Sequence, residues 1–379
     1  MKLLHVFSAP QSAYIFMEGQ LQYMHKHGCE VTVVIPADRI INPKFKTREP
    51  NIKVINAPIK RNIALFNDIY TFFCLLWIFI KIKPDIIHLH TPKASLIGAL
   101  AARVLFKKNI VYQMHGLVSI RGNQVEKGLL YHMEKLTCTL ATKIFAVSKS
   151  IRDFAIENEY TSIDKISVIE NGTINGIEYH TRFNPKNILK NVKNLDQKTE
   201  NKFVIGFVGR VSDDKGIYEY LDVIARCRKN SLETIGVVIG PDESNGLFGK
   251  HMKELDLAFD TDILYYGDQT APESYMIYFD VLLLPTKREG FGLVATEVNA
   301  LEIPVIGYEI PGFSDAVINE ETGFLVPYMN VDALYKTLIK YYFDPKLKLK
   351  HGVNGRKRVI KDFDSNKIWE SLLAEYQKM

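Results

Sequence analysis

The sequence predicts an α/β fold with two doubly wound, Rossmann-like domains. Short β-branched runs alternate with helical stretches in the first half, a polar segment interrupts them, and the alternation then restarts. Strands that alternate with crossover helices form parallel sheets, and ligands bind at the carboxyl ends of such strands. The length of 379 residues exceeds what one hydrophobic core usually serves, which also favours two domains.

The first domain is expected over residues 1–183. Its strand candidates are short runs rich in Ile, Val and Leu, separated by helical patterns or loops. The seven candidates are Leu3–Ser8, Glu30–Ile35, Ile52–Ala57, Asp85–His90, Ile110–Met114, Lys143–Val147 and Ile166–Glu170.

A linker is expected at residues 184–201, which are rich in Asn and Lys and poor in apolar periodicity. The second domain is expected over residues 202–364, and a last helix over residues 365–379. The six strand candidates of the second domain are Phe203–Val208, Thr234–Gly240, Asp262–Tyr266, Asp280–Leu284, Ile303–Gly307 and Gly323–Val326.

Composition narrows the class of protein. The net charge of +5 is spread along the chain, which argues against dedicated nucleic-acid binding. The apolar run after Lys2 is too short for a signal peptide and is expected to form the first strand. Four cysteines lie far apart without a C-x-x-C pair, which favours free thiols and a cytoplasmic location. These cysteines are Cys29, Cys74, Cys138 and Cys227.

The longest apolar run is Ile69 to Ile80. As a helix it would be about 18 Å long, too short to span a hydrocarbon core of about 30 Å. Two interpretations remain open. A core helix is favoured, because parallel sheets bury helices on both faces. The alternative is a helix that touches a membrane through its aromatic side chains and terminal lysines. These residues are Phe72, Phe73, Trp77, Phe79, Lys81 and Lys83.

A nucleotide-sugar site is predicted at residues 285–297. The apolar run Val281–Leu284 leads into a glycine-rich turn and then a helix, which presents backbone N–H groups and the positive end of the helix dipole. Two carboxylates with seven residues between them flank this turn. Glu289 is expected to accept hydrogen bonds from a hexose, and Glu297 from a ribose diol.

A second motif places two cations in one loop. The strand ending near Val208 is followed by Arg210 and Lys215, and a helix is expected to begin near Ile217. Both cations can converge on a diphosphate and stabilise the charge that develops on a leaving nucleoside diphosphate. That arrangement needs no metal ion, and none is expected.

Histidines follow two strands of the first domain. His115 comes directly after the strand Ile110–Met114, so its side chain can project from the strand's carboxyl end. His88 and His90 point to one face of their strand, but two histidines without a third ligand are weak support for a metal. Packing or acceptor contact is favoured for them. The Asp-x-Asp sequence at Asp362–Asp364 is expected to cap the last helix.

Together the R-x4-K and E-x7-E motifs resemble those of retaining family 4 glycosyltransferases, particularly bacterial enzymes of capsule, O-antigen and exopolysaccharide assembly. The resemblance extends over nearly the whole chain. Besides the two motifs it includes the segments Pro84–Ala94, Met114–Gly116, Val147–Ser150 and Glu320–Val326.

This resemblance implies a GT-B fold, in which two Rossmann-like domains face a cleft and the last helix packs back on the first domain. It implies donor binding by Arg210, Lys215, Glu289 and Glu297, with the backbone of Phe291, Gly292 and Leu293 nearby. His115 would face the anomeric centre, so the implied catalytic residues are His115, Arg210, Lys215 and Glu289. The implied donor is a nucleotide sugar, with UDP preferred over GDP.

The acceptor side departs from the family pattern. Many relatives carry a Gly-Gly pair in the first strand–helix loop, where this chain reads Ser8-Ala9-Pro10-Gln11-Ser12-Ala13. Acceptor contacts are expected from Ser8, Gln11 and Ser12 in this loop, or these residues cap the helix. His90 and Lys93 are further candidates. The expected acceptor is a lipid-linked saccharide, with peripheral contact to the cytoplasmic face of a membrane.

Three alternatives compete with sugar transfer. A glycoside hydrolase would pair Glu289 with Glu297, but helical spacing puts them about 12 Å apart, beyond the roughly 5–9.5 Å that hydrolysis needs. A dinucleotide oxidoreductase would need G-x-G-x-x-G after the first strand, which the sequence lacks. A non-catalytic nucleotide-sugar-binding module is disfavoured by the intact set of charged residues.

Overall fold

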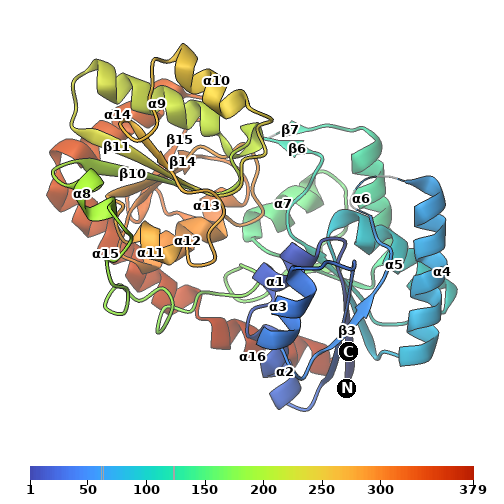
Figure 1. The fold of residues 1–379 in the computed structure, drawn as a ribbon. Helices are drawn as coiled ribbons and strands as arrows, with labels where there is room; N and C mark the ends of the chain where they lie inside the picture. Colours follow the sequence, from blue (N-terminus) through green and yellow to red (C-terminus); the bar gives the residue numbers. More distant parts are fainter. Residues whose placement is uncertain (61, 63, 123) are drawn as a thin grey trace. The chain divides into compact units, whose positions relative to one another are not determined.

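The computed structural model describes residues 1–60, 62, 64–122 and 124–379. The chain forms two compact units, each built around its own sheet (Figure 1). The first unit comprises residues 1–120, 124–176 and 365–379, and the second comprises residues 121–123 and 177–364. Residues 184–201 belong to the second unit and include helix α8 (Leu195–Thr199).

In the first unit the sheet has seven strands in the order β3-β2-β1-β4-β5-β8-β9, and neighbouring strands pair in parallel. All seven predicted strands are present, with ends within two residues of the prediction. Their bounds are β1 Lys2–Val6, β2 Glu30–Ile35, β3 Lys53–Asn56, β4 Ile86–His90, β5 Ile110–Met114, β8 Lys143–Ala146 and β9 Ile166–Val168. Every residue of β4 and β5 is buried, as expected for central strands covered on both faces.

Helices cover both faces of this sheet. One face packs on α1 (Pro10–Phe16), α2 (Gln20–Lys26), α3 (Ile41–Arg48) and α16 (Ser365–Gln377). The other packs on α4 (Leu65–Ile82), α5 (Pro92–Val104), α6 (Leu129–Leu140) and α7 (Lys149–Glu157). The last helix therefore belongs to the first unit, where Tyr376 is buried and the indole of Trp369 donates to the Asn175 carbonyl at 3.0 Å.

Helix α4 is longer than the apolar run that predicted it, and its 18 residues span about 27 Å. One face packs in the core through Leu75 and Phe79, whereas Phe73 and Trp77 are each 60% exposed. The helix is therefore neither a fully buried core helix nor a polar-faced amphipathic one.

The second unit has a six-stranded parallel sheet in the order β12-β11-β10-β13-β14-β15. All six predicted strands are again present. Their bounds are β10 Phe203–Val208, β11 Thr234–Ile239, β12 Ile263–Tyr265, β13 Val281–Leu284, β14 Val305–Tyr308 and β15 Gly323–Val326. A two-stranded sheet of β6 (Ile120–Arg121) and β7 (Gln124–Val125) was not predicted.

The helices of the second unit include a short 3-10 turn, η1, in the loop after β10. Their bounds are η1 Asp213–Lys215, α9 Ile217–Lys229, α10 Leu247–Glu254, α11 Glu273–Met276, α12 Leu293–Ala300, α13 Phe313–Ala316, α14 Val331–Phe343 and α15 Pro345–Asp362. Strands β10 and β13 are neighbours in the sheet, so the loops that follow them leave the same edge side by side.

Candidate active site

In the second unit the loop after β10 and the turn after β13 are packed together by a glycine. Gly216 has a φ of +77°, and a Cβ atom there would lie 1.9 Å from the carbonyl oxygen of Pro285. The backbone N–H of Lys287 donates to the Asp214 carbonyl at 2.9 Å, which joins the two loops further. A side chain at position 216 would force these loops apart.

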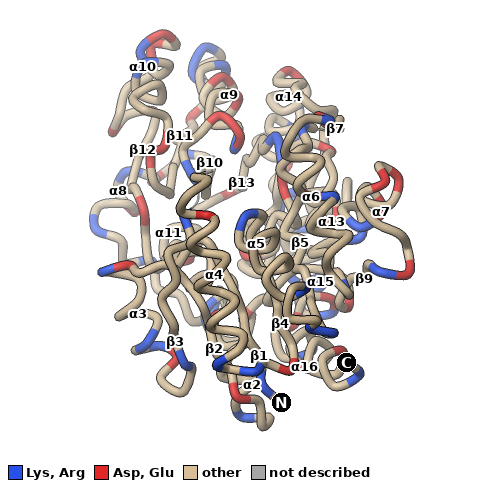
Figure 2. The backbone as a smooth tube through the Cα atoms, turned by 90° about the vertical axis from the view of Figure 1, so that its right-hand side faces the viewer, with Lys and Arg blue, Asp and Glu red and all other residues tan. Residues whose placement is uncertain are grey.

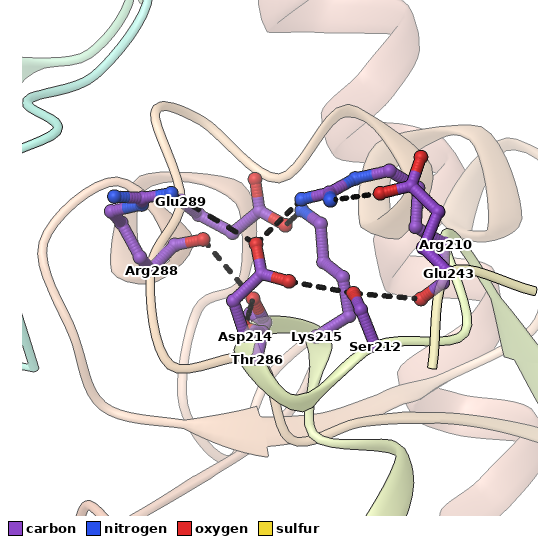
Figure 3. Close-up of polar contacts among 8 residues, drawn as sticks. All are labelled: Arg210, Ser212, Asp214, Lys215, Glu243, Thr286, Arg288 and Glu289. Atoms are coloured by element: carbon purple, nitrogen blue, oxygen red, sulfur yellow. Dashed lines mark hydrogen bonds and ion pairs between the residues drawn. The ribbon is translucent and has the colours of Figure 1, made fainter. Parts of the chain in front are cut away.

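The guanidinium of Arg210 lies between two carboxylates (Figure 3). It donates to Glu243 at 2.7 Å and to Asp214 at 2.5 Å. Glu243 reaches the site from the loop after β11, because its backbone N–H donates to the Val211 carbonyl at 3.1 Å. Asp214 also accepts from the Ser212 hydroxyl at 2.6 Å. The guanidinium is thus held in one orientation at the edge of the sheet.

Lys215 and Glu289 form an ion pair between the two loops. The Lys215 side chain is 21% exposed and that of Glu289 is 15% exposed, so water screens this pair only in part. Arg288 adds a further cation, 3.9 Å from the Asp214 carboxylate. Figure 3 shows how the cations and carboxylates of this cluster alternate.

Electrostatics favour the charged forms of Asp214 and Arg210. Burial raises the pKa of Asp214, but the Ser212 hydrogen bond and the charges of Arg210 and Lys215 outweigh it, so the pKa is lowered overall. Burial likewise lowers the pKa of Arg210, yet its bonds to Glu243 and Asp214 raise it on balance. The cluster contains equal numbers of basic and acidic side chains. The basic ones are Arg210, Lys215 and Arg288, and the acidic ones are Asp214, Glu243 and Glu289.

Helix α12 begins beside this cluster. Its N-terminal flank Gly292 has a φ of +79°, and a Cβ there would lie 2.8 Å from the Phe313 ring. The first turn of a helix leaves backbone N–H groups without intrahelical partners, so Phe291, Gly292 and Leu293 offer a binding edge for an anion or a hydroxyl. Glu297 lies in the second turn of α12 and is half-buried.

In the first unit four histidines cluster where β1, β4 and β5 lie side by side. His115 Nε2 is 3.1 Å from His90 Nδ1, and His90 Nε2 is 3.0 Å from His5 Nδ1. Burial lowers the pKa of His115 to about 4 and that of His5 to about 3. Burial and the neighbouring histidines lower the pKa of His90 and of His88 well below the usual value. All four rings are therefore neutral at physiological pH.

The hydrogen bonds that link His5, His90 and His115 can run in either of two directions. Each neutral imidazole has one N–H donor and one acceptor nitrogen. If His5 donates to His90 and His90 donates to His115, the unpartnered His5 Nε2 is an unused acceptor; the reverse direction leaves it a buried unpaired N–H. Unused acceptors are the more readily tolerated, which favours the first direction. His115 then keeps its proton on Nδ1, as a donor.

A third histidine lies beside the predicted pair on β4. This residue, His5, joins His88 and His90, and one ring nitrogen from each lies within 4.8 Å of the others. Among the residues that the structure describes, these three histidines lie close enough together to be candidate metal ligands, but both ring nitrogens of His90 are hydrogen-bonded to His5 and His115. No local sequence signal links His5 to the other two histidines, because His5 lies 83 residues before His88 and reaches it only through the β1–β4 pairing.

The predicted acceptor residues are divided between buried and exposed positions. His90 is fully buried and stacks on Phe7 at a ring distance of 4.1 Å, so it supports His115 and does not face solvent. Lys93 is buried and pairs with Asp68 at 2.5 Å. The Ser8 backbone N–H donates to the Thr91 hydroxyl at 3.0 Å, and the Ser8 hydroxyl is hydrogen-bonded to the same oxygen at 2.8 Å instead of capping a helix.

Helix α1 begins at Pro10 after Ala9, without a side-chain cap. Gln11 is exposed, and Ser12 is half-buried and donates its backbone N–H to the Ala9 carbonyl at 3.1 Å.

In the second unit Asp362 lies 3.8 Å from Arg358, and Asp364 pairs with Ile177 in a β-bridge.

Sequence reasoning missed the carboxylates that hold Arg210. Asp214 lies in the same loop as the R-x4-K motif, between Arg210 and Lys215. Glu243 lies 33 residues from Arg210, and only the pairing of β10 with β11 brings them together. Arg288, next to Glu289, was also missed, although its position beside the E-x7-E motif was a usable signal.

Two α/β units with this arrangement of loops define a glycosyltransferase of the GT-B class, and sequence comparison identifies the family. Residues 17–173 match the model of Glycosyltransferase Family 4, and residues 190–358 match that of Glycosyl transferases group 1. The chain is 32% identical to the capsular polysaccharide biosynthesis glycosyltransferase CapM of Staphylococcus aureus, over 99% of this chain and 96% of that protein. The chain therefore belongs to the family 4 glycosyltransferases.

Two further comparisons extend this result. The chain is 25% identical to the UDP-Gal:alpha-D-GlcNAc-diphosphoundecaprenol alpha-1,3-galactosyltransferase of Escherichia coli, over 80% of this chain and 78% of that protein. Among solved structures, Anabaena Alr3699/HepE in complex with UDP-glucose superposes with a TM-score of 0.82 at 18% identity, over the full length of both chains. The latter likeness establishes the GT-B fold. Family membership argues against the hydrolase and oxidoreductase alternatives.

Proposed function

We propose that the protein is a retaining, metal-independent transferase that moves a hexose or N-acetylhexosamine from a UDP-sugar to a lipid-linked saccharide during synthesis of a cell-surface polysaccharide. The observation that carries this proposal is the ion pair of Lys215 with Glu289, which joins the R-x4-K loop to the E-x7-E turn. The relatives that act in capsule synthesis and on a diphosphoundecaprenol acceptor support it.

In this proposal Arg210 and Lys215 bind the donor diphosphate. Both cations have carboxylate partners in the absence of ligand, so the diphosphate replaces part of the bonding that Glu243, Asp214 and Glu289 supply. These carboxylates hold the cations in place before the donor arrives, which reduces the entropy lost on binding. Bound diphosphate also frees Glu289 to accept hydrogen bonds from sugar hydroxyls.

The remaining donor contacts come from α12. The backbone N–H groups of Phe291, Gly292 and Leu293 contact the diphosphate or the sugar, and Glu297 binds the ribose diol. Neutral His115 donates a hydrogen bond from Nδ1 to the donor sugar. Its pKa of about 4 makes it a poor base and a stable neutral donor above pH 5.

The transfer itself needs no dedicated protein base. The bond from the anomeric carbon to the phosphate oxygen breaks while the acceptor oxygen attacks from the same face, which retains configuration. The acceptor hydroxyl gives its proton to the leaving phosphate oxygen. Arg210 and Lys215 stabilise the negative charge on that phosphate as the bond breaks.

The acceptor binds to the first unit, where Ser8, Gln11, Ser12 and Lys93 lie at the carboxyl ends of the strands. Because its lipid anchor remains in a bilayer, the enzyme works in the cytoplasm at the inner membrane face. A membrane-borne acceptor should then be used faster than a short soluble sugar.

Calorimetric titration with UDP, GDP, dTDP, ADP and NAD tests the donor assignment. We expect selective binding of UDP, and UDP-glucose, UDP-galactose and UDP-N-acetylglucosamine then narrow the sugar. Incubation with membrane lipid extract and the selected donor should yield a lipid-soluble product, whose anomeric configuration NMR determines. Binding of NAD alone, or a product of inverted configuration, would refute the proposal.

A further inference from the structure

Helix α4 carries a row of exposed apolar side chains that its own unit leaves uncovered. Five residues at spacings of three or four form this row, which we call the α4 stripe: Phe66, Ile69, Phe73, Trp77 and Ile80. Their exposed fractions range from 49% to 88%. Soluble monomers rarely expose contiguous apolar surface on this scale without a binding partner.

The opposite side of α4 is a core face. Leu75, Ile78, Phe79 and Ile82 are buried against the sheet of the first unit. By length and composition α4 is apolar enough to cross a membrane, but a crossing helix would have to withdraw these side chains from their core. The fold is therefore compatible with a helix that lies along the surface of a bilayer, and not with one that crosses it.

The neighbouring helix end extends the apolar surface. Helices α4, α5 and α6 lie side by side on one face of the sheet (Figures 1 and 2). At the end of α5, Val104 is 56% exposed and Phe106 is 90% exposed. Lys107 Nζ donates to the Pro84 carbonyl at 3.3 Å, which fixes this end beside the end of α4.

The charges around the stripe are mostly positive. Along α4 itself Asp68 and Lys81 are the only charged residues, and Figure 2 shows the helix as tan over most of its length. Asp68 is paired with Lys93. Exposed cations gather where α4 and α5 end, and these are Lys81, Lys83, Arg103 and Lys108.

We propose that the α4 stripe docks on a bilayer rich in anionic lipid, with α4 lying in the membrane plane. The stripe enters the region between headgroups and acyl chains, and the cations at the helix end meet lipid phosphates. Trp77 suits this interface because aromatic rings accumulate at headgroup level, and Lys81 Nζ lies 4.6 Å from its ring centroid.

The α4 stripe also bears on how the acceptor reaches the enzyme, an inference that rests on the proposed function. Asp68 in the first turn of α4 contacts Lys93 at 2.5 Å, and Lys93 follows His90 at the carboxyl end of β4. Docking through the stripe therefore brings the strand ends of the first unit, where the acceptor is proposed to bind, close to the lipid headgroups.

Vesicle binding by the full chain tests the proposal without donor or acceptor. The chain has two tryptophans, and Trp369 is 7% exposed whereas Trp77 is 60% exposed, so a fluorescence change on binding reports mainly on Trp77. We expect a blue shift with phosphatidylglycerol vesicles, and quenching when the acyl chains are brominated. Phosphatidylcholine vesicles should give a weaker response.

Two double variants test whether the α4 stripe is the surface that binds vesicles. Phe66→Ser with Phe73→Ser should weaken vesicle binding at least tenfold, measured by flotation. The matched control removes two exposed apolar side chains from the second unit, Phe343→Ser with Leu349→Ser, which are 70% and 61% exposed, and should bind as the wild type does. Circular dichroism and Tm of both double variants should match the wild type, because none of these side chains is buried.

Three results would overturn the proposal. The wild type could fail to float with anionic vesicles, or the stripe variant could float as well as the control. Sedimentation could instead reveal a dimer that the stripe variant dissociates, which would assign the surface to a second copy of the chain. UDP binding is measured separately, so failure at the membrane is distinguishable from failure of the donor assignment.

Discussion

Replacing Lys215 by alanine tests the proposed chemistry most directly. Its ammonium lies in an ion pair that is 21% and 15% exposed, where an effective dielectric constant of about 20 applies. At that value a charge about 4 Å from the leaving phosphate contributes about 4 kcal/mol, or roughly a thousandfold in rate. Screening by the remaining water lowers this figure, so we expect kcat to fall by about 10²- to 10³-fold.

The assay is transfer of radiolabelled sugar from the donor that calorimetry selects into lipid-soluble product, at saturating donor. Lys348→Ala is a matched control, because Lys348 pairs with Asp280 in the same unit at 26% and 25% exposure, outside the proposed site. We expect the control to keep its rate, and both variants to remain folded by circular dichroism. If Lys215→Ala keeps a rate within threefold of the wild type, the leaving-group argument is wrong.

Three further predictions concern donor affinity, pH and metal. Glu297→Gln should weaken UDP binding about 10- to 100-fold in calorimetry, the value of about 1.5–3 kcal/mol for a hydrogen bond to a charged group; unchanged affinity would place the ribose elsewhere. His5 has a folded pKa of about 3 against 6.5, so it binds fewer protons folded than unfolded as pH falls below 6.5. Folding with His5 neutral should therefore lower the free energy of unfolding by about 2 kcal/mol at pH 5 relative to pH 8. Urea titrations at both pH values should show that the free energy of unfolding falls less between pH 8 and pH 5 for His5→Gln than for the wild type. For the control His25→Gln, at an exposed position, it should fall as much as for the wild type. Dialysis against EDTA should leave the transfer rate unchanged, and a rate restored by Zn²⁺ or Mg²⁺ would contradict the metal-independent mechanism.

Much of the fold was predictable because its signals are local. Parallel strands buried on both faces are short runs of Val, Ile and Leu, so all thirteen predicted strands appear with small shifts at their ends. The short β6–β7 pair was missed because two-residue strands carry no periodicity. The donor motifs were also local, since each is a strand end, a glycine turn and charged residues in one segment.

The partners of those motif residues were not predictable. Glu243 meets Arg210 through the pairing of β10 with β11, and Lys215 meets Glu289 because β10 and β13 are neighbours. Strand order decides such contacts, and it does not follow from any one segment. The same reason hid His5 from the group of His88 and His90, which the sequence presented as two histidines alone.

By itself the sequence determined the parallel α/β class, the two nucleotide-sugar motifs and the family they resemble, because periodicity and motif spacing lie within short stretches of chain. Only the tertiary structure decided which charges are paired and which surfaces stay uncovered. The apolar run of α4 illustrates the difference. Its composition favoured a core helix and left a membrane-facing helix open, and only packing against the sheet determined which side chains are buried and which remain exposed.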